Sequence, residues 1–189
     1  MSNKILCLIF AMSIAIVFTA DSDAANYLGA KKCKACHMKQ YKSWSKTSMA
    51  TSFENLKPGI KTEEKKKAGI DPDKDYTTDE NCLSCHTTGY GRPGGFKSLS
   101  ETPKLINVQC ESCHGPGADF RAIMKKDKKF KLSDVKAAGL MIPSETENNC
   151  LECHGGESPF NEKVDPKYKF EIKDRLEKTH EHFPLKYKH

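Results

Sequence analysis

Eight of the nine cysteines form four pairs, each pair has two residues between its cysteines, and a histidine follows each pair directly. The four motifs are Cys33-Lys34-Ala35-Cys36-His37, Cys82-Leu83-Ser84-Cys85-His86, Cys110-Glu111-Ser112-Cys113-His114 and Cys150-Leu151-Glu152-Cys153-His154. This spacing is the attachment signature of c-type haem. Both thiols bond to one porphyrin, and the histidine that follows ligates its iron as the proximal ligand. The motifs therefore predict four covalently bound haem c groups, each with an iron.

Other uses of paired cysteines fit this pattern less well. Zinc sites also use such pairs, but they need a second ligand pair and do not require histidine at the next position each time. Thioredoxin-like redox pairs occur singly, near a β-α-β pattern that this sequence lacks. After residue 24, every cysteine belongs to a motif and every pair has its histidine. The sequence thus predicts a tetrahaem c-type cytochrome.

The residue types and their spacing do not by themselves identify the distal iron ligands. Such ligands are usually histidine or methionine, and beyond the motifs the histidines are His180, His182 and His189. Four histidine distal ligands are therefore impossible, so either methionine completes some sites or some irons are open. The methionine candidates are Met38, Met49, Met124 and Met141. His180 and His182 are two residues apart on a predicted helix, so we expect them to point to different sides.

Hydrophobic residues are 37% of the 189 residues and are concentrated at the N-terminus. Lys4 precedes the apolar run 5–18, and the small-residue site Ser22-Asp23-Ala24 follows. This is typical of a secretory signal peptide; an uncleaved anchor is the alternative, but the run is short for a membrane that needs about 20 residues. We expect residues 1–24 to be a signal peptide, residues 25–189 to be one tetrahaem cytochrome domain, and the protein to be periplasmic, with no stable membrane insertion after cleavage.

The rest of the chain predicts short helices and loops wrapped around four haems, a mainly α fold. Too few hydrophobic residues follow Ala24 to build an ordinary core, so the porphyrins are expected to fill the interior. No alternating strand pattern is evident. The predicted helices cover residues 38–56, 62–68 with Thr62 as N-cap and Gly69 as stop, 118–127, 133–139 and 169–182, and a capping box of Ser144 and Glu147 precedes the fourth motif.

Positive charge slightly exceeds negative charge, with a formal net charge of +6. Runs such as 65–67 could suggest nucleic acid. In an exported haem protein these cations instead balance the haem propionates, so we expect no nucleic-acid partner. The remaining positive charge suggests a docking face for an acidic redox partner.

Several strings in one order resemble the tetrahaem cytochrome c-554 family, over nearly all of the chain after residue 24. They are 31–37, Ser43-Trp44, 56–58, Asp71-Pro72, 74–77, the CESCHGPG string at 110–117, Phe120-Arg121, Val164-Asp165, Lys167-Tyr168 and 180–182. The resemblance implies three six-coordinate haems and one five-coordinate haem, arranged as two stacked pairs. A well-known member of the family takes electrons from hydroxylamine oxidoreductase.

The family's ligand positions imply an unusual set in this chain. Alignment from Trp44 puts Met49 where the family has the distal histidine of the third haem. Alignment from Phe120-Arg121 puts Met124 where the family has the distal histidine of the first haem. His180 matches the distal ligand of the fourth haem, and the second haem has no distal protein ligand. The resemblance thus implies His114 with Met49, His37 with Met124 and His154 with His180; because thioether is the weaker donor to ferric iron, two potentials should rise.

The loop after His154 is shorter than in the family, with Ser158 and Phe160 at the places that line the open side of the second haem. His182 or His189 could close that side. We expect a single-electron carrier between redox partner proteins whose identity is open. The alternatives are a reductase of a small molecule such as nitric oxide at an open second haem, and a subunit of a haem-stacked filament.

Overall fold

The computed structural model describes residues 26–145, 148–155 and 158–183, and within these ranges the regular structure is helical. Thr87 and Ile106 form an isolated antiparallel bridge, the only β pairing in the described ranges. This confirms the mainly α prediction. The α-helices are α1 (Ala30–Cys33), α2 (Met38–Trp44), α3 (Thr62–Lys67), α4 (Glu80–His86), α5 (Cys110–His114), α6 (Ala118–Lys126), α7 (Leu132–Ala137), α8 (Asn148–His154) and α9 (Ile172–Thr179).

The helix predicted over 38–56 is in fact two helices. α2 ends at Trp44, and a 3-10 helix, Ser48–Leu56, follows with a kink at Thr51. The hydroxyl of Thr47 donates to the carbonyl of Trp44 at 2.8 Å, a local bond that competes with continuing the helix. The hydrophobic periodicity therefore predicted both helical segments correctly but did not predict the break between them.

The other helices lie near their predicted positions, with corrected ends. α3 begins at Thr62, but the residue before it is Lys61 with a left-handed φ of 57°, so Thr62 is not the N-cap. Gly69, with a φ of 70°, follows the helix as predicted. α6 and α7 match 118–127 and 133–139 closely. Glu147 of the predicted capping box and the predicted signal peptide, residues 1–24, lie outside the described residues.

The C-terminal helix is shorter than the predicted 169–182. α9 ends at Thr179, and His180 has extended backbone angles. His180 and His182 therefore lie beyond the helix, and their ring centroids are 4.7 Å apart. The expectation that they point to different sides is wrong, because it assumed a helix that has already ended.

The hydrophobic core is small and lies around the second motif. Its buried residues are Tyr27, Phe53, Leu56, Tyr76, Leu83, Phe96 and Leu105. Of these, Leu83 belongs to a motif helix, α4. Phe120 and Val135 are buried where α6 packs against α7. The core is thus confined to one part of the molecule, although the four motifs are spread along it.

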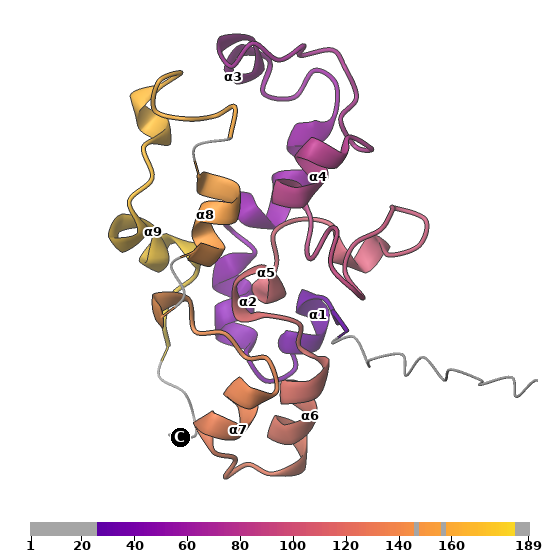
Figure 1. Ribbon diagram of the computed structural model, residues 1–189, viewed down its shortest axis with the longest axis vertical. Coiled ribbons are helices and arrows are strands. Elements are labelled where there is room, and N and C mark those ends of the chain that lie inside the picture. Colours follow the sequence, from indigo (N-terminus) through magenta and orange to yellow (C-terminus); the bar gives the residue numbers. More distant parts are fainter. Residues whose placement is uncertain (1–25, 146–147, 156–157, 184–189) are drawn as a thin grey trace, which may run out of the picture.

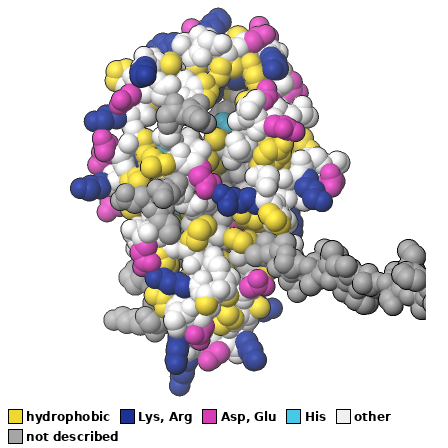
Figure 2. All heavy atoms as spheres, in the orientation of Figure 1, with side chains coloured by type: hydrophobic (Ala, Val, Ile, Leu, Met, Phe, Trp, Pro, Cys, Tyr) yellow, Lys and Arg dark blue, Asp and Glu magenta, His cyan; other side chains and the backbone are white. Residues whose placement is uncertain are grey.

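The molecule is elongated, with α3 near one end and the α6–α7 pair at the other (Figure 1). Helices α1 and α5, which carry the first and third motifs, contact each other, as do α4 and α8, which carry the second and fourth. Hydrophobic side chains on the face in Figure 2 lie in separate groups between charged ones. None of the helices within the described ranges combines the length and apolar character needed to cross a membrane.

Candidate haem sites

Each motif is carried by a short helix, which explains its spacing. The second, third and fourth motifs lie within α4, α5 and α8, and the first begins in α1 and continues through a turn to His37. Residues three apart in a helix lie on the same face, so such a helix directs both sulfur atoms to one side. The histidine follows at the helix end, where it can face the same cofactor.

Two of the motif histidines have their ring orientation set by backbone carbonyls. Nδ1 of His86 lies 2.6 Å from the carbonyl oxygen of Ser52, and Nδ1 of His114 lies 3.2 Å from that of Met141. A carbonyl only accepts, so Nδ1 carries the proton in both rings and Nε2 is left with its lone pair. This is the second-shell arrangement that orients metal-binding histidines.

Burial also keeps the motif histidines in their ligating form. It is the main cause that lowers the pKa of His37, His86, His114 and His154 below the ordinary value. A nearby His180 further lowers the pKa of His37. Since only neutral imidazole binds a metal, the folded chain favours the protonation state that haem iron requires.

A cavity of about 700 Å³ lies at the second motif and has room for a large cofactor. Cys82, Cys85 and His86 line it, together with Ser158 and Phe160, the two residues that the resemblance places there. Within the part of the chain that the structure describes, its lining includes no methionine and no second histidine. The donor set and the space therefore fit a haem with one protein ligand to iron.

Lys65 is a buried cation in the wall of this cavity. It is 4% exposed, its Nζ donates to the carbonyl of Lys57 at 2.8 Å, and it lies 5.4 Å from the centre of the Tyr76 ring. Its positive charge also contributes to the lowered pKa of His86. A buried ammonium here is suited to pair with a haem propionate, which offsets the cost of burying it.

Sulfur contacts show which attachment sites are neighbours. The Cys33 and Cys110 side chains hydrogen-bond, which lowers the pKa of Cys33 and raises that of Cys110. The Cys85 and Cys153 side chains do the same, which lowers the pKa of Cys85 to about 6.

The third and fourth motifs also lie near each other, because the Asn149 amide donates to the carbonyls of Ser112 and Cys113. Burial, with a smaller contribution from the nearby Cys150, raises the pKa of Cys113 to about 11. The first site therefore adjoins the third, the third adjoins the fourth, and the fourth adjoins the second.

Glu111, inside the third motif, joins that motif to the first. Its carboxylate is 2% exposed and accepts hydrogen bonds from the backbone nitrogens of Leu28, Gly29 and Gly117, the last two at 2.7 Å. Leu28 and Gly29 lead directly into α1. Gly115, with a φ of 79°, ends α5 and turns the chain so that Gly117 returns to Glu111. The string CESCHGPG is thus one hydrogen-bonded unit.

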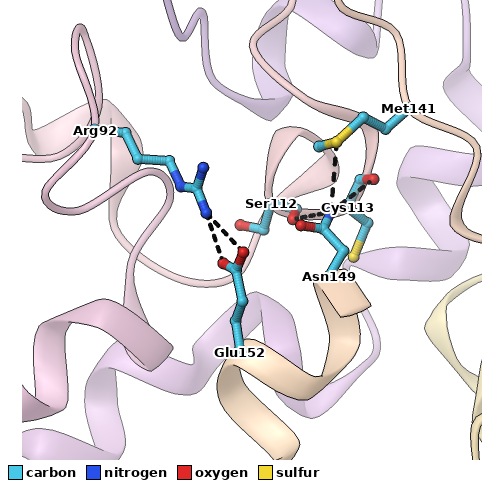
Figure 3. A network of polar contacts seen from close by, with 6 residues as sticks. All are labelled: Arg92, Ser112, Cys113, Met141, Asn149 and Glu152. Carbon is cyan, nitrogen blue, oxygen red and sulfur yellow. Dashed lines mark hydrogen bonds and ion pairs between the residues drawn. The ribbon is translucent and has the colours of Figure 1, made fainter. Parts of the chain in front are cut away.

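A second polar network links the third and fourth motifs (Figure 3). Nδ2 of Asn149 donates to the carbonyls of Ser112 and Cys113, both at 3.3 Å, and lies 3.9 Å from the sulfur of Met141. Glu152 forms a two-oxygen ion pair with Arg92, at 2.7 and 2.8 Å. Asn149 therefore fixes the start of α8 against the end of α5.

Met49 and Met124 lie in the segments that adjoin their expected sites. The Met49 carbonyl accepts from the nitrogen of Val108 at 3.2 Å, two residues before the third motif. Met124 is on α6, one turn after Arg121, whose charge acts on Cys33 of the first motif. Both methionines are half-buried. These placements support each methionine near its expected haem, while the coordination itself stays a prediction.

The other candidates lie as follows. Met38 is 42% exposed, and Met141 serves through its carbonyl, as described above. The ring centroid of His180 lies 6.3 Å from that of His114. His154 stacks on Phe170, with centroids 4.2 Å apart. The recorded contacts thus bring His180 to His114 and not to His154, and the pairing of His154 with His180 stays a prediction. His189 lies outside the described residues.

Sequence reasoning missed the supporting residues Glu111, Lys65 and Asn149. Glu111 and Asn149 bond to backbone groups of distant segments and Lys65 to a carbonyl eight residues away, and none of these bonds leaves a periodic signal. A partial signal did exist for Glu111, because it lies within a string that matches the family. Lys65 gave the opposite signal, since a lysine in a charged run usually lies in solvent.

Comparison with known proteins agrees with this arrangement. The family model described as "Cytochrome c554 and c-prime" matches residues 32–115. Cytochrome c-554 of Nitrosomonas europaea is 37% identical over an alignment of 210 residues that covers 98% of this chain and 88% of that protein. The structure of reduced cytochrome c554 from Nitrosomonas europaea matches with a TM-score of 0.76 and 36% identity, covering 86% of this chain and 88% of that one. With its four haem c attachment sites, the chain therefore belongs to the cytochrome c-554 family of electron-transfer proteins.

Proposed function

We propose that this chain carries single electrons between redox partner proteins through its attachment sites in the order first, third, fourth, second. The observations that carry this order are the packing of α1 on α5 and of α4 on α8, and the hydrogen bonds from Asn149 at the start of α8 to the carbonyls of Ser112 and Cys113. When bound, each haem supplies one reversible one-electron couple at its iron. The chain's own residues fix the spacing between neighbouring sites, through Glu111 between the first and third and Asn149 between the third and fourth.

The proposed site residues are the eight motif cysteines as attachment points and the seven predicted iron ligands. The ligands are His37, His86, His114, His154, His180, Met49 and Met124. We also propose that residues 1–24 are a signal peptide and that residues 25–189 act in the periplasm. The apolar run after Lys4 supports export, as does the use of every later cysteine in a haem motif.

Electron paramagnetic resonance of the oxidised protein tests the order of sites. We expect magnetic coupling within two pairs, first with third and second with fourth. Replacing Cys110 and Cys113 by Ser removes the third attachment and should uncouple the first haem while leaving the second and fourth coupled. A variant with Ser at Cys150 and Cys153 is the matched control, which should instead uncouple the second. If replacing Cys110 and Cys113 disturbs the second haem and spares the first, the order is wrong. Spectra of the unmodified protein that show no coupled pairs would also contradict the order.

A second function, binding and reduction of a small molecule such as nitric oxide, is favoured by the cavity at His86. Among the described residues its lining has no methionine and no second histidine, and Ser158 and Phe160 bound a space of about 700 Å³ shared with the cofactor. Recording the same spectra with cyanide tests this function. A change confined to one high-spin haem supports the reductase, and unchanged spectra reject it.

Replacing Met49 or Met124 by His tests the methionine ligands. Imidazole stabilises ferric iron better than thioether does, so each variant should lower the reduction potential of one haem and remove one methionine charge-transfer band from the near-infrared spectrum. Replacing the exposed Met38 by His is the control and should change neither. If a potential and its band persist after the Met49 or Met124 change, that methionine is not a ligand.

A further inference from the structure

The first attachment motif lies in a segment whose charge is all of one sign. Residues 26–53 contain six lysines and neither aspartate nor glutamate. The other motifs have acidic residues within or directly before them: Asp79 and Glu80 at the second, Glu111 in the third and Glu152 in the fourth. The first motif therefore lies in a segment with six positive side chains and no negative one.

These six lysines are exposed and lack acidic partners within the part of the chain that the structure describes. They are Lys31, Lys32, Lys34, Lys39, Lys42 and Lys46, and together we name them the lysine face. Each is classed as exposed, and none is in an ion pair with a described residue, whereas Lys66 pairs with Glu63 and Lys97 with Glu101. Two of the six lie over aromatic rings, Lys34 over Tyr41 and Lys39 over Phe183. The face thus presents positive charge that no described carboxylate neutralises.

Lysines of the lysine face flank the most exposed motif cysteine along the chain. Cys36 is exposed, while the other seven motif cysteines are partly buried. Met38, two residues on, is 42% exposed and provides an apolar contact. Lysines lie on both sides of this pair, on α1 before it and on α2 after it. An exposed attachment cysteine and an exposed apolar residue, with exposed lysines before and after them in the chain, suit brief docking of a redox protein.

We propose that the lysine face docks the acidic surface of a partner redox protein and makes the first haem site the port for electron exchange with it. This inference rests on the proposed function, because it takes the first site as one end of the series. Unpaired charges of one sign steer an oppositely charged partner over long distances and raise association rates by ~10–1000-fold at low salt. The small apolar centre keeps the complex short-lived, as electron transfer requires.

An anionic membrane is the other surface that lysines could meet, and the structure favours a protein. Interfacial membrane helices need a continuous hydrophobic face. α2 is seven residues long and has no buried residue, and Met38 is its exposed large hydrophobic residue. The lysine face therefore has positive charge but lacks the apolar area that an interfacial membrane helix needs.

The test is stopped-flow reduction of the holoprotein by the hydroquinone of an acidic flavodoxin, at low and high ionic strength. The variant K31E/K39E/K42E reverses three charges of the lysine face and spares the motif. The control, K66E/K97E/K163E, makes the same change of net charge at exposed lysines elsewhere. We expect the first variant to slow the low-salt bimolecular rate at least tenfold and to lose its salt dependence, and the control to stay within twofold of the parent protein.

Equal slowing in both variants overturns the proposal, since net charge would then suffice. So does a parent rate that is insensitive to salt, or sedimentation of the parent with phosphatidylglycerol vesicles while both variants react normally with flavodoxin. Reduction of each variant by dithionite tests the proposed function independently of the docking proposal. If all four haems do not become reduced and reoxidised, electron carriage itself fails, whatever the flavodoxin rates.

Discussion

Residues 25–189 made without haem attachment are expected to be unfolded. The described part of the chain buries ten hydrophobic side chains, most of them in one cluster around α4. Burial of hydrophobic side chains is the main favourable contribution to folding, and it must offset the conformational entropy that the ordered backbone loses. The main hydrophobic cluster contains no residue of α1, α5 or α8, so the porphyrins must supply the contacts that stabilise these helices.

Far-ultraviolet circular dichroism and amide hydrogen exchange of the haem-free chain measure this. We expect little helical signal, no cooperative thermal transition and exchange close to that of an unstructured chain, against strong protection in the holoprotein. A haem-free chain that melts cooperatively would contradict the prediction. A variant with Ser at Cys82 and Cys85 alone is a graded control, because it removes one haem and should lose only part of the protection.

Replacing Glu111 by Ala is expected to destabilise the holoprotein by about 3–5 kcal/mol. The carboxylate accepts from three backbone nitrogens, two of them buried and one partly buried, and loss of a partner costs about 1–3 kcal/mol for each unsatisfied group, with some relaxation. Because two of these nitrogens precede α1, the first motif should lose its position relative to the third. Glu111→Gln keeps one acceptor oxygen, so its stability should lie between that of the parent protein and that of the Ala variant.

Chemical denaturation of the holoprotein, monitored in the Soret region and by circular dichroism, measures this change. The matched control is Glu152→Ala, also within a motif, whose ion pair with Arg92 is half exposed. Surface pairs of this kind contribute about 0–1 kcal/mol. Equal effects of the two variants would show that the bonds of Glu111 are not the reason for its burial.

The sequence predicts the positions of the motifs more completely than it predicts the structure around them. The cysteine and histidine positions follow from the chemistry of thioether attachment, which fixes a spacing along the chain. The helix ends were less certain. Thr47 breaks the segment 38–56 with a bond to the backbone, and α9 ends at Thr179 before its predicted end, so that His180 and His182 come together. Such local bonds compete with hydrophobic periodicity and leave it unchanged.

By itself the sequence determined the four motifs, the haem chemistry, the family and the scarcity of ordinary core residues, because each depends on residue types and on short spacings. The tertiary structure decided which motifs are neighbours, which carbonyls orient His86 and His114, and that Glu111 and Lys65 are buried. The physical reason is the range of the interactions. Covalent haem attachment depends on a motif of five consecutive residues. The hydrogen bonds of Glu111 to Leu28 and of Asn149 to Cys113 join segments 83 and 36 residues apart, which only folding brings together.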